Sequence, residues 1–205
     1  MTIKLYELAA SAVITLALTA CGTTPNSNYY LLTSEATNIP ADSVLSLGVG
    51  PIEIPEYLNR NAFVYSRDHN QLHIASFERW AEPLDSAIER VLRLNLASLL
   101  NTQNVQSYPF GSNEKPEYAV EVSLLRLDAD NSGASLTAEW RLYRPQQKET
   151  IKRQISKLHQ DISSHPLQAT DIAPAYSRLL LQLSEVIAAA ISAAVEMPTT
   201  AREYP

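Results

Sequence analysis

The sequence contains a single cysteine among its 205 residues, which excludes an intrachain disulfide framework and any Cys-rich metal site. It also lacks an excess of basic residues: 16 Lys and Arg against 22 Asp and Glu give a net charge of −6. This balance argues against a protein that binds nucleic acid or an anionic membrane through a basic surface. Charges, proline and glycine are scattered through the sequence after about the first 20 residues, which excludes a protein with several membrane spans.

Catalytic signatures are also missing from the sequence. It contains no G-x-S-x-G elbow, Walker loop, dinucleotide fingerprint or H-E-x-x-H motif. His69 and His73 lie on a predicted hairpin, where an extended strand would hold them about 13 Å apart. A turn between them would shorten that distance, but solvated loop histidines are the favoured interpretation. Asp128 and Asp130 are explained equally well by a cation site or by a turn. The sequence therefore predicts no enzyme, no bound metal and no cofactor.

The lone cysteine follows a short apolar segment near the amino terminus. Lys4 is followed by an uncharged run over residues 8–18, which is too short for a spanning helix of about 20 residues but has the length of a secretory signal core. The run ends in a pattern that resembles a bacterial lipobox: Leu18, Thr19, Ala20 and Cys21. We predict a signal peptide over residues 1–20, with Leu18, Thr19 and Ala20 recognised by the signal peptidase.

The chemistry of such a segment predicts a lipid anchor on Cys21. A thiol can form a thioether to diacylglycerol, and the new amino group of Cys21 can then be acylated. The alternative is an ordinary signal peptide whose cleavage site happens to precede a free cysteine. The next residue is Gly22 rather than Asp, and in proteins that resemble this one Asp there marks retention in the inner membrane. The resemblance thus implies the inner leaflet of the outer membrane, facing the periplasm, with residues 21–28 as lipidated amino terminus and tether.

Two segments have the apolar period of a helix. The first begins at Pro83 and runs to about Asn101, with Asp85 placed favourably in its first turn. The second runs from about Ile172 to Val195, and its Ala-rich end would permit close packing on its own sheet or on a neighbouring subunit. A homo-oligomer is predicted from that second possibility.

The remaining ordered sequence has the patterns of β-strands. Alternating or β-branched runs separated by turn residues predict strands at about residues 29–33, 44–54, 63–65, 72–74, 118–124, 136–142 and 150–158. The last of these is mostly polar, as expected for a sheet edge. Together with the helices they predict one α+β domain over residues 29–195, mostly an antiparallel sheet packed with two main helices. Residues 196–205 read as a disordered tail.

Three short sequence segments occur in an order that is typical of a known family. They are the segments Tyr29–Leu32, Val49–Arg60 and Arg79–Leu84. With the lipobox before them, they resemble the PqiC (YmbA-like) family of ABC-type transport auxiliary lipoproteins. The resemblance implies an outer-membrane lipoprotein that supports envelope integrity by docking a PqiB-like MCE protein, which forms a tunnel for lipids across the periplasm.

Two other functions remain open at this point. The domain would be a lipid-binding module if it held a lipid in its own pocket between the helices and the sheet. It would be a periplasmic hydrolase if distant residues built an unrecognised site. A large apolar pocket would favour the first alternative, and clustered His, Asp and Ser side chains would favour the second.

The motif residues are our candidates for a partner or oligomer interface: Tyr57, Arg60, Arg79, Trp80 and Glu82. One interpretation is purely structural, with an Arg79–Glu82 ion pair fixing the loop before the helix and Trp80 packed beneath it. The other exposes Arg79 and Trp80 on a binding surface, where such residues commonly dominate affinity. In the same way, residues 55–60 form either a turn between strands or a rim loop that contacts a partner.

Overall fold

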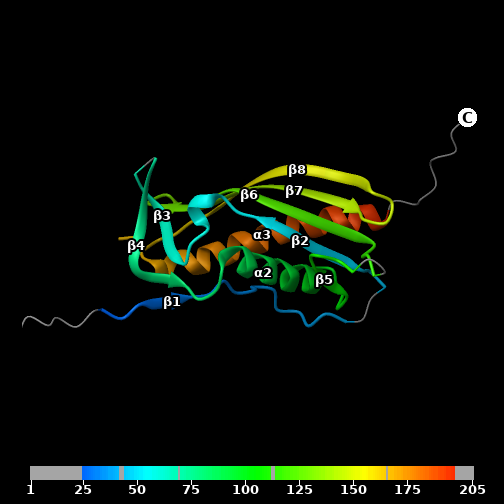
Figure 1. The fold of residues 1–205 in the computed structure, drawn as a ribbon, viewed down its shortest axis with the longest axis horizontal. Coiled ribbons are helices and arrows are strands. Elements are labelled where there is room, and N and C mark those ends of the chain that lie inside the picture. The colour runs from blue at the N-terminus through cyan, green and yellow to red at the C-terminus, as the bar shows by residue number, and fades with distance from the viewer. Residues whose placement is uncertain (1–24, 42–43, 69, 112–113, 165, 197–205) are drawn as a thin grey trace, which may run out of the picture.

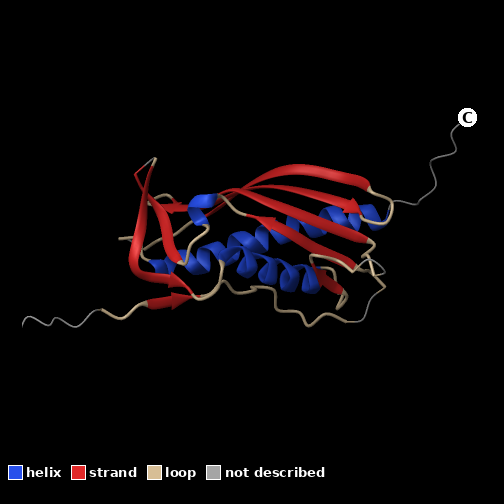
Figure 2. Cartoon of the chain, viewed as in Figure 1, coloured by secondary structure: helices blue, strands red, loops and turns tan. Residues whose placement is uncertain are grey.

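The computed structural model describes residues 25–41, 44–68, 70–111, 114–164 and 166–196, and it builds them into two sheets and two long helices (Figure 2). The larger sheet has the strand order β5-β2-β6-β7-β8, with β2 at Leu47–Glu53, β5 at Val105–Ser107, β6 at Tyr118–Asp130, β7 at Gly133–Arg144 and β8 at Glu149–Gln160. The smaller sheet has the order β1-β4-β3, with β1 at Asn28–Tyr30, β3 at Ala62–Asp68 and β4 at Gln71–Trp80. The helices are α2 (Leu84–Leu99) and α3 (Ala169–Glu196), and a 3-10 turn, η1, spans Glu56–Leu58.

Helix α2 forms where the apolar period predicted it. It starts directly after Pro83, carries Asp85 in its first turn, and closes near Asn101, which adopts a left-handed φ of 53°. Its apolar stripe is almost fully buried and comprises Leu84, Ile88, Val91, Leu92 and Leu96. The stripe faces α3 and β2, so amphipathic patterning directs this helix onto the core.

Helix α3 is the central core helix of the protein. By length and hydropathy it qualifies as a membrane span, but 14 of its 28 residues are buried against other elements. Its two buried serines are satisfied within the helix, since the Ser177 hydroxyl donates to the Ala173 carbonyl (3.1 Å) and the Ser184 hydroxyl to the Leu180 carbonyl (2.7 Å). Helix α3 therefore contributes its apolar surface to the fold of the domain.

The two helices pack on one face of the five-stranded sheet and leave the other face open (Figure 1). The alternation in β6 and β7 has this cause: Val120, Val122 and Leu142 are buried, whereas Glu121 and Arg141 on the opposite face are partly exposed. The small sheet and its β3–β4 hairpin stand at one end of this layered body (Figure 1). The molecule thus offers an uncovered sheet face and a hairpin end as its distinctive surfaces.

The structure confirms a single α+β domain with two main helices, and it corrects the expected sheet. The described residues form two sheets, and both are mixed. Three strand pairs are antiparallel (β3–β4, β6–β7 and β7–β8) and three are parallel (β1–β4, β2–β5 and β2–β6). The antiparallel pairs are neighbours in the sequence joined by short turns. The parallel pairs join strands that are separated by several other elements, because parallel strands require a long crossover.

The segment after β1 attaches the amino-terminal end to the body. Strand β1 lies parallel to the end of β4, and the chain then runs along α2 (Figure 1). Leu32 is fully buried, the Thr33 amide donates to the Ser177 hydroxyl (3.1 Å), and the Ser34 hydroxyl donates to Asn95 (2.6 Å). The predicted first strand is thus shorter than expected, and its second half is a packed extended segment.

Candidate docking surface around the motif loops

The two longest family-like segments meet at the hairpin end of the molecule. The Trp80 amide donates to the Asn61 carbonyl at 2.7 Å, and Ala62 pairs with Arg79 in the β3–β4 ladder. The segment that ends at Arg60 therefore lies beside the segment that begins at Arg79. Sequence reasoning selected both segments but had no means of placing them together.

Trp80 lies in the core and not on a surface. Its side chain is 4% exposed, and its ring stacks on Phe63 with the centroids 4.2 Å apart and the planes at 26°. Tyr30 meets Phe63 edge-on at 5.5 Å, and Tyr176 of α3 lies 6.3 Å from Trp80. This aromatic cluster joins β1, β3, β4 and α3. Burial thus favours the structural interpretation of Trp80 and corrects the expectation that it is exposed to a partner.

The expected ion pair between Arg79 and Glu82 is replaced by another. The Glu82 carboxylate accepts a hydrogen bond from Arg90 of α2, and the same Nη2 of Arg90 donates to the Leu32 carbonyl at 2.9 Å. Arg79 instead lies opposite Tyr29, and its Nε donates to the Ser27 hydroxyl at 3.4 Å. Glu82 follows the end of β4 and is directed towards the helix, so it fixes the amino-terminal segment and α2 rather than the strand.

Tyr57 and Arg60 flank the buried Leu58 of η1. Tyr57 is half-buried near Leu127 of β6, and burial raises the pKa of its phenol. Arg60 is exposed, and it precedes the strand that pairs with Arg79. Of the five candidates, the structure therefore leaves Arg60 exposed and Arg79, Glu82 and Tyr57 partly accessible. These four side chains around the hairpin base form the candidate docking surface.

A buried carboxylate holds the hairpin to the larger sheet. Asp128 of β6 is 5% exposed and accepts hydrogen bonds from the Ser66 amide (2.7 Å), the Ser66 hydroxyl and the Arg126 guanidinium (2.8 Å). Ser66 belongs to β3, so these bonds connect the two sheets directly. The pair Asp128 and Asp130 thus divides into a structural residue and a turn residue, since Asp130 accepts from the Ser132 amide at 2.7 Å.

We expect Asp128→Asn to lower the free energy of unfolding by about 1–3 kcal/mol, because the amide NH₂ that replaces one carboxylate oxygen cannot accept a hydrogen bond at a buried site where both oxygens accept. The matched control is Asp130→Asn in the exposed turn, where we expect a change within about 0.5 kcal/mol. Urea unfolding of both purified variants measures the difference. Equal effects at the two positions would contradict the assigned role of Asp128.

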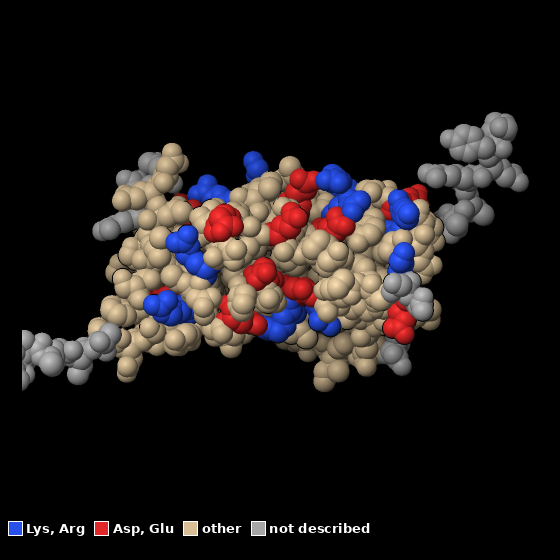
Figure 3. All heavy atoms as spheres, viewed as in Figure 1, with Lys and Arg blue, Asp and Glu red and all other residues tan. Residues whose placement is uncertain are grey.

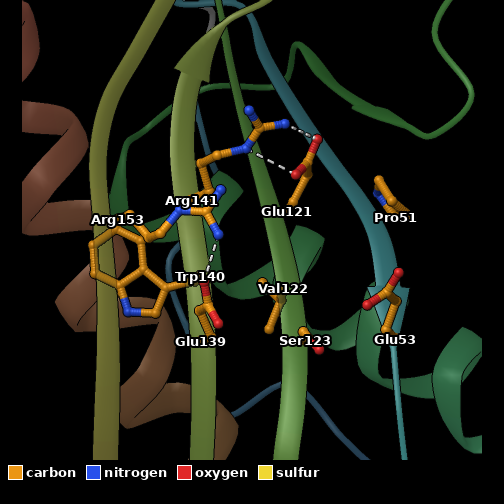
Figure 4. A pocket seen from close by; sticks show the side chains of 9 residues that line it. All are labelled: Pro51, Glu53, Glu121, Val122, Ser123, Glu139, Trp140, Arg141 and Arg153. Carbon is orange, nitrogen blue, oxygen red and sulfur yellow. Dashed lines mark hydrogen bonds and ion pairs between the residues drawn. The ribbon is translucent and has the colours of Figure 1, made fainter.

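The open face of the larger sheet contains a shallow depression of about 210 Å³ (Figure 4). Arg141 makes a bidentate pair with Glu121 (2.9 and 2.6 Å), and Arg153 pairs with Glu139 at 2.6 Å. Hydrogen bonding to Glu121 raises the pKa of Arg141. The alternation in the sequence predicted that β6 and β7 are half-exposed. It did not reveal these two ion pairs, because they depend on the register between neighbouring strands.

Both surfaces present polar and charged side chains. Two of the carboxylates in the depression, those of Glu121 and Glu139, are paired with guanidinium groups. No cluster of three or more His, Cys, Asp or Glu with metal-binding geometry occurs among the described residues. The predicted lipidation site Cys21, with Leu18, Thr19 and Ala20, lies outside the described residues, as do His69 and the tail from residue 197.

Comparisons with known proteins support the family resemblance. The model of a family described as "ABC-type transport auxiliary lipoprotein component" matches residues 29–188. A crystal structure of an uncharacterized protein is 24% identical and has a TM-score of 0.68, covering 82% of this chain and 99% of its own. A DUF330 protein from Xanthomonas campestris is 13% identical with a TM-score of 0.69, covering 83% of this chain and 100% of its own. At these identities the two structures show the fold alone. No curated protein matches the chain significantly.

Proposed function

Because this chain belongs to the family of ABC-type transport auxiliary lipoprotein components, we propose that it is anchored through Cys21 in the inner leaflet of the outer membrane. There it would act as the docking subunit of an MCE-type lipid transport system with a PqiB-like partner and support envelope integrity. The family is one of transport auxiliaries and not of enzymes. The observation that carries the proposal is the family match, which spans nearly the whole described domain.

The packing of the domain favours an adaptor over a carrier of lipid. Between the helices and the larger sheet the space is occupied by fully buried side chains, among them Trp140, Tyr176 and Leu136. Four surface depressions lined by described residues have volumes of about 210, 350, 440 and 370 Å³. These volumes suit at most one drug-sized molecule, and a two-chain phospholipid is larger. A docking function needs no internal cavity and agrees with this filled core.

Homo-oligomerisation remains part of the proposal. At the Ala-rich end of α3, Ala188 and Ala194 pack on the chain's own core, whereas Ala189, Ala193 and Val195 are exposed. Small exposed side chains allow close approach of a second helix. Sedimentation of the lipid-free protein at high concentration tests this part, and a monomer would count against it.

The docking role is tested with Arg79→Ala in intact cells. We expect the variant to fold normally, because Arg79 is partly exposed and its bonds to Ser27 and Ser76 are long (3.4 and 3.5 Å). We also expect it to lose most crosslinking to the MCE-type partner, since arginine often dominates interface energy. Partner identification by mass spectrometry after crosslinking is the measurement.

The matched control is Arg153→Ala, because Arg153 is a more exposed arginine that lies on β8, an edge strand of the larger sheet. Full crosslinking by both variants would show that the hairpin base does not contact the partner. If the wild-type chain captures only proteins unrelated to lipid transport, the proposed function itself fails.

A further inference from the structure

The β3–β4 hairpin exposes apolar side chains that the docking function does not use. On β4, Leu72 is 41% exposed, Ile74 is 50% exposed and Phe77 is 37% exposed. We call these three residues the hairpin patch. The stretch Gln71–Phe77 contains no Asp, Glu, Lys or Arg. Exposed apolar residues gathered on one element indicate a contact with an apolar phase or a partner.

The hairpin patch lies beside the point where the chain leaves towards its predicted anchor. Strand β1 pairs in parallel with the end of β4, with Asn28 opposite Glu78, the residue next to Phe77. Pro25, the first described residue, follows Cys21 by four positions, a separation that spans at most about 14 Å. In Figure 1 the amino-terminal end and the hairpin occupy the same end of the molecule. A lipid on Cys21 would therefore hold this end close to the bilayer.

The charge distribution fits an apolar contact at this end. In Figure 3 charged side chains are spread over the face shown, including its left part. On β4 the charged residues Glu78 and Arg79 come only after the stretch Gln71–Phe77, so the apolar contact is confined to that stretch. The chain as a whole carries a net charge of −6, so attraction to anionic lipids would not hold the domain against a membrane.

We propose that the hairpin patch rests in the bilayer interface and orients the domain on its lipid anchor, an inference that depends on the anchoring at Cys21 proposed above. The lipid anchor supplies the affinity for the membrane, and the hairpin patch sets the orientation of the domain relative to the bilayer. With the β3–β4 end on the lipid surface, the opposite end of the molecule, with β5 and the β7–β8 turn, points away from the membrane (Figure 1).

The test uses the lipidated full-length chain, in which the thioether leaves Cys21 without a free thiol. Ile74→Cys places a label in the hairpin patch, and Ile155→Cys is the control because Ile155 is also a strand isoleucine, 56% exposed, on β8. Each variant is labelled with a nitrobenzoxadiazole fluorophore and reconstituted into phosphatidylethanolamine–phosphatidylglycerol vesicles that contain a nitroxide lipid. We expect the Ile74 label to shift to the blue and to lose roughly half of its emission, since interfacial apolar groups sink about 5–10 Å into the headgroup region. The Ile155 label should do neither.

Vesicle flotation separates the two proposals. If both variants float but the labels are quenched equally, the membrane contact is wrong and the anchor stands. A blue shift at Ile74 without lipid quenching would identify a protein surface, such as a second copy, as the occupant, and would also overturn the contact. A chain that does not float would overturn the anchor together with the inference. Leu72→Cys repeats the measurement at a second patch position, so that one perturbed variant does not decide the outcome.

Discussion

Replacing Trp80 by alanine is expected to lower the free energy of unfolding by about 3–5 kcal/mol, the usual cost of truncating a buried Trp. Trp80 is 4% exposed and its ring stacks on Phe63 at 4.2 Å, so alanine would leave a cavity where the small sheet meets α3. Domain stabilities are commonly about 5–15 kcal/mol, so this loss would remove a large share of the total. Urea unfolding of the purified protein measures it.

Two controls separate this packing effect from other causes. Arg79→Ala alters the neighbouring residue on β4 but removes only long, partly exposed hydrogen bonds, and we expect a change within about 0.5 kcal/mol. Tyr176→Phe removes a buried hydroxyl that has no hydrogen-bond partner among the described residues. Because no bond is lost, that variant is expected to be at least as stable as the parent. A mild effect of Trp80→Ala would show that the aromatic cluster is not a principal support of the small sheet.

Replacing Cys21 by serine is expected to abolish both fatty-acid labelling and membrane attachment. Serine lacks the thiol that forms the thioether, and each methylene of a lost acyl chain removes about 0.8 kcal/mol of membrane affinity. Without the two or three acyl chains, only weak surface contacts hold the domain on the membrane. Metabolic labelling with radioactive palmitate, followed by separation of membranes from the soluble fraction, measures the result.

The neighbouring Gly22 provides the control and a finer test. We expect Gly22→Ala to keep both the label and the outer-membrane position, because it leaves the thiol and introduces no charge. Gly22→Asp should keep the label but shift the protein to the inner membrane, if sorting follows the pattern implied by the family resemblance. Persistence of the Cys21→Ser variant in the membrane fraction would show that something other than this lipid holds the protein there.

The elements with a clear internal period were predictable from the sequence. The apolar stripe of α2, the long apolar face of α3 and the alternation in β6 and β7 each depend on residues within one segment, and the structure confirms all of them. The hairpins were predictable for the same reason, because turn residues join strands that are neighbours in the sequence. The family, too, followed from short strings of residues, and the matched range of residues 29–188 confirms it.

Contacts between distant segments were beyond the reach of that reasoning. Nothing in the local pattern of β2 states that it lies parallel to β5 and β6, or that β1 pairs with the end of β4. Glu82 forms its ion pair with Arg90. The predicted partner, Arg79, is nearer in the sequence, but it lies on β4 opposite Tyr29 of β1. The Arg141–Glu121 ion pair likewise depends on the register between β6 and β7.

The sequence alone thus determined the α+β composition of the domain, its two amphipathic helices, its family and the predicted lipid attachment point at Cys21. Only the tertiary structure decided that Trp80 is a core residue, that the sheets are mixed, and that the amino-terminal strand pairs with the end of β4, directly after the exposed apolar residues of that strand. The physical reason is that backbone periodicity and covalent motifs are local properties of the chain. Burial and ion pairing are settled by competition among all segments for the same core and the same partners.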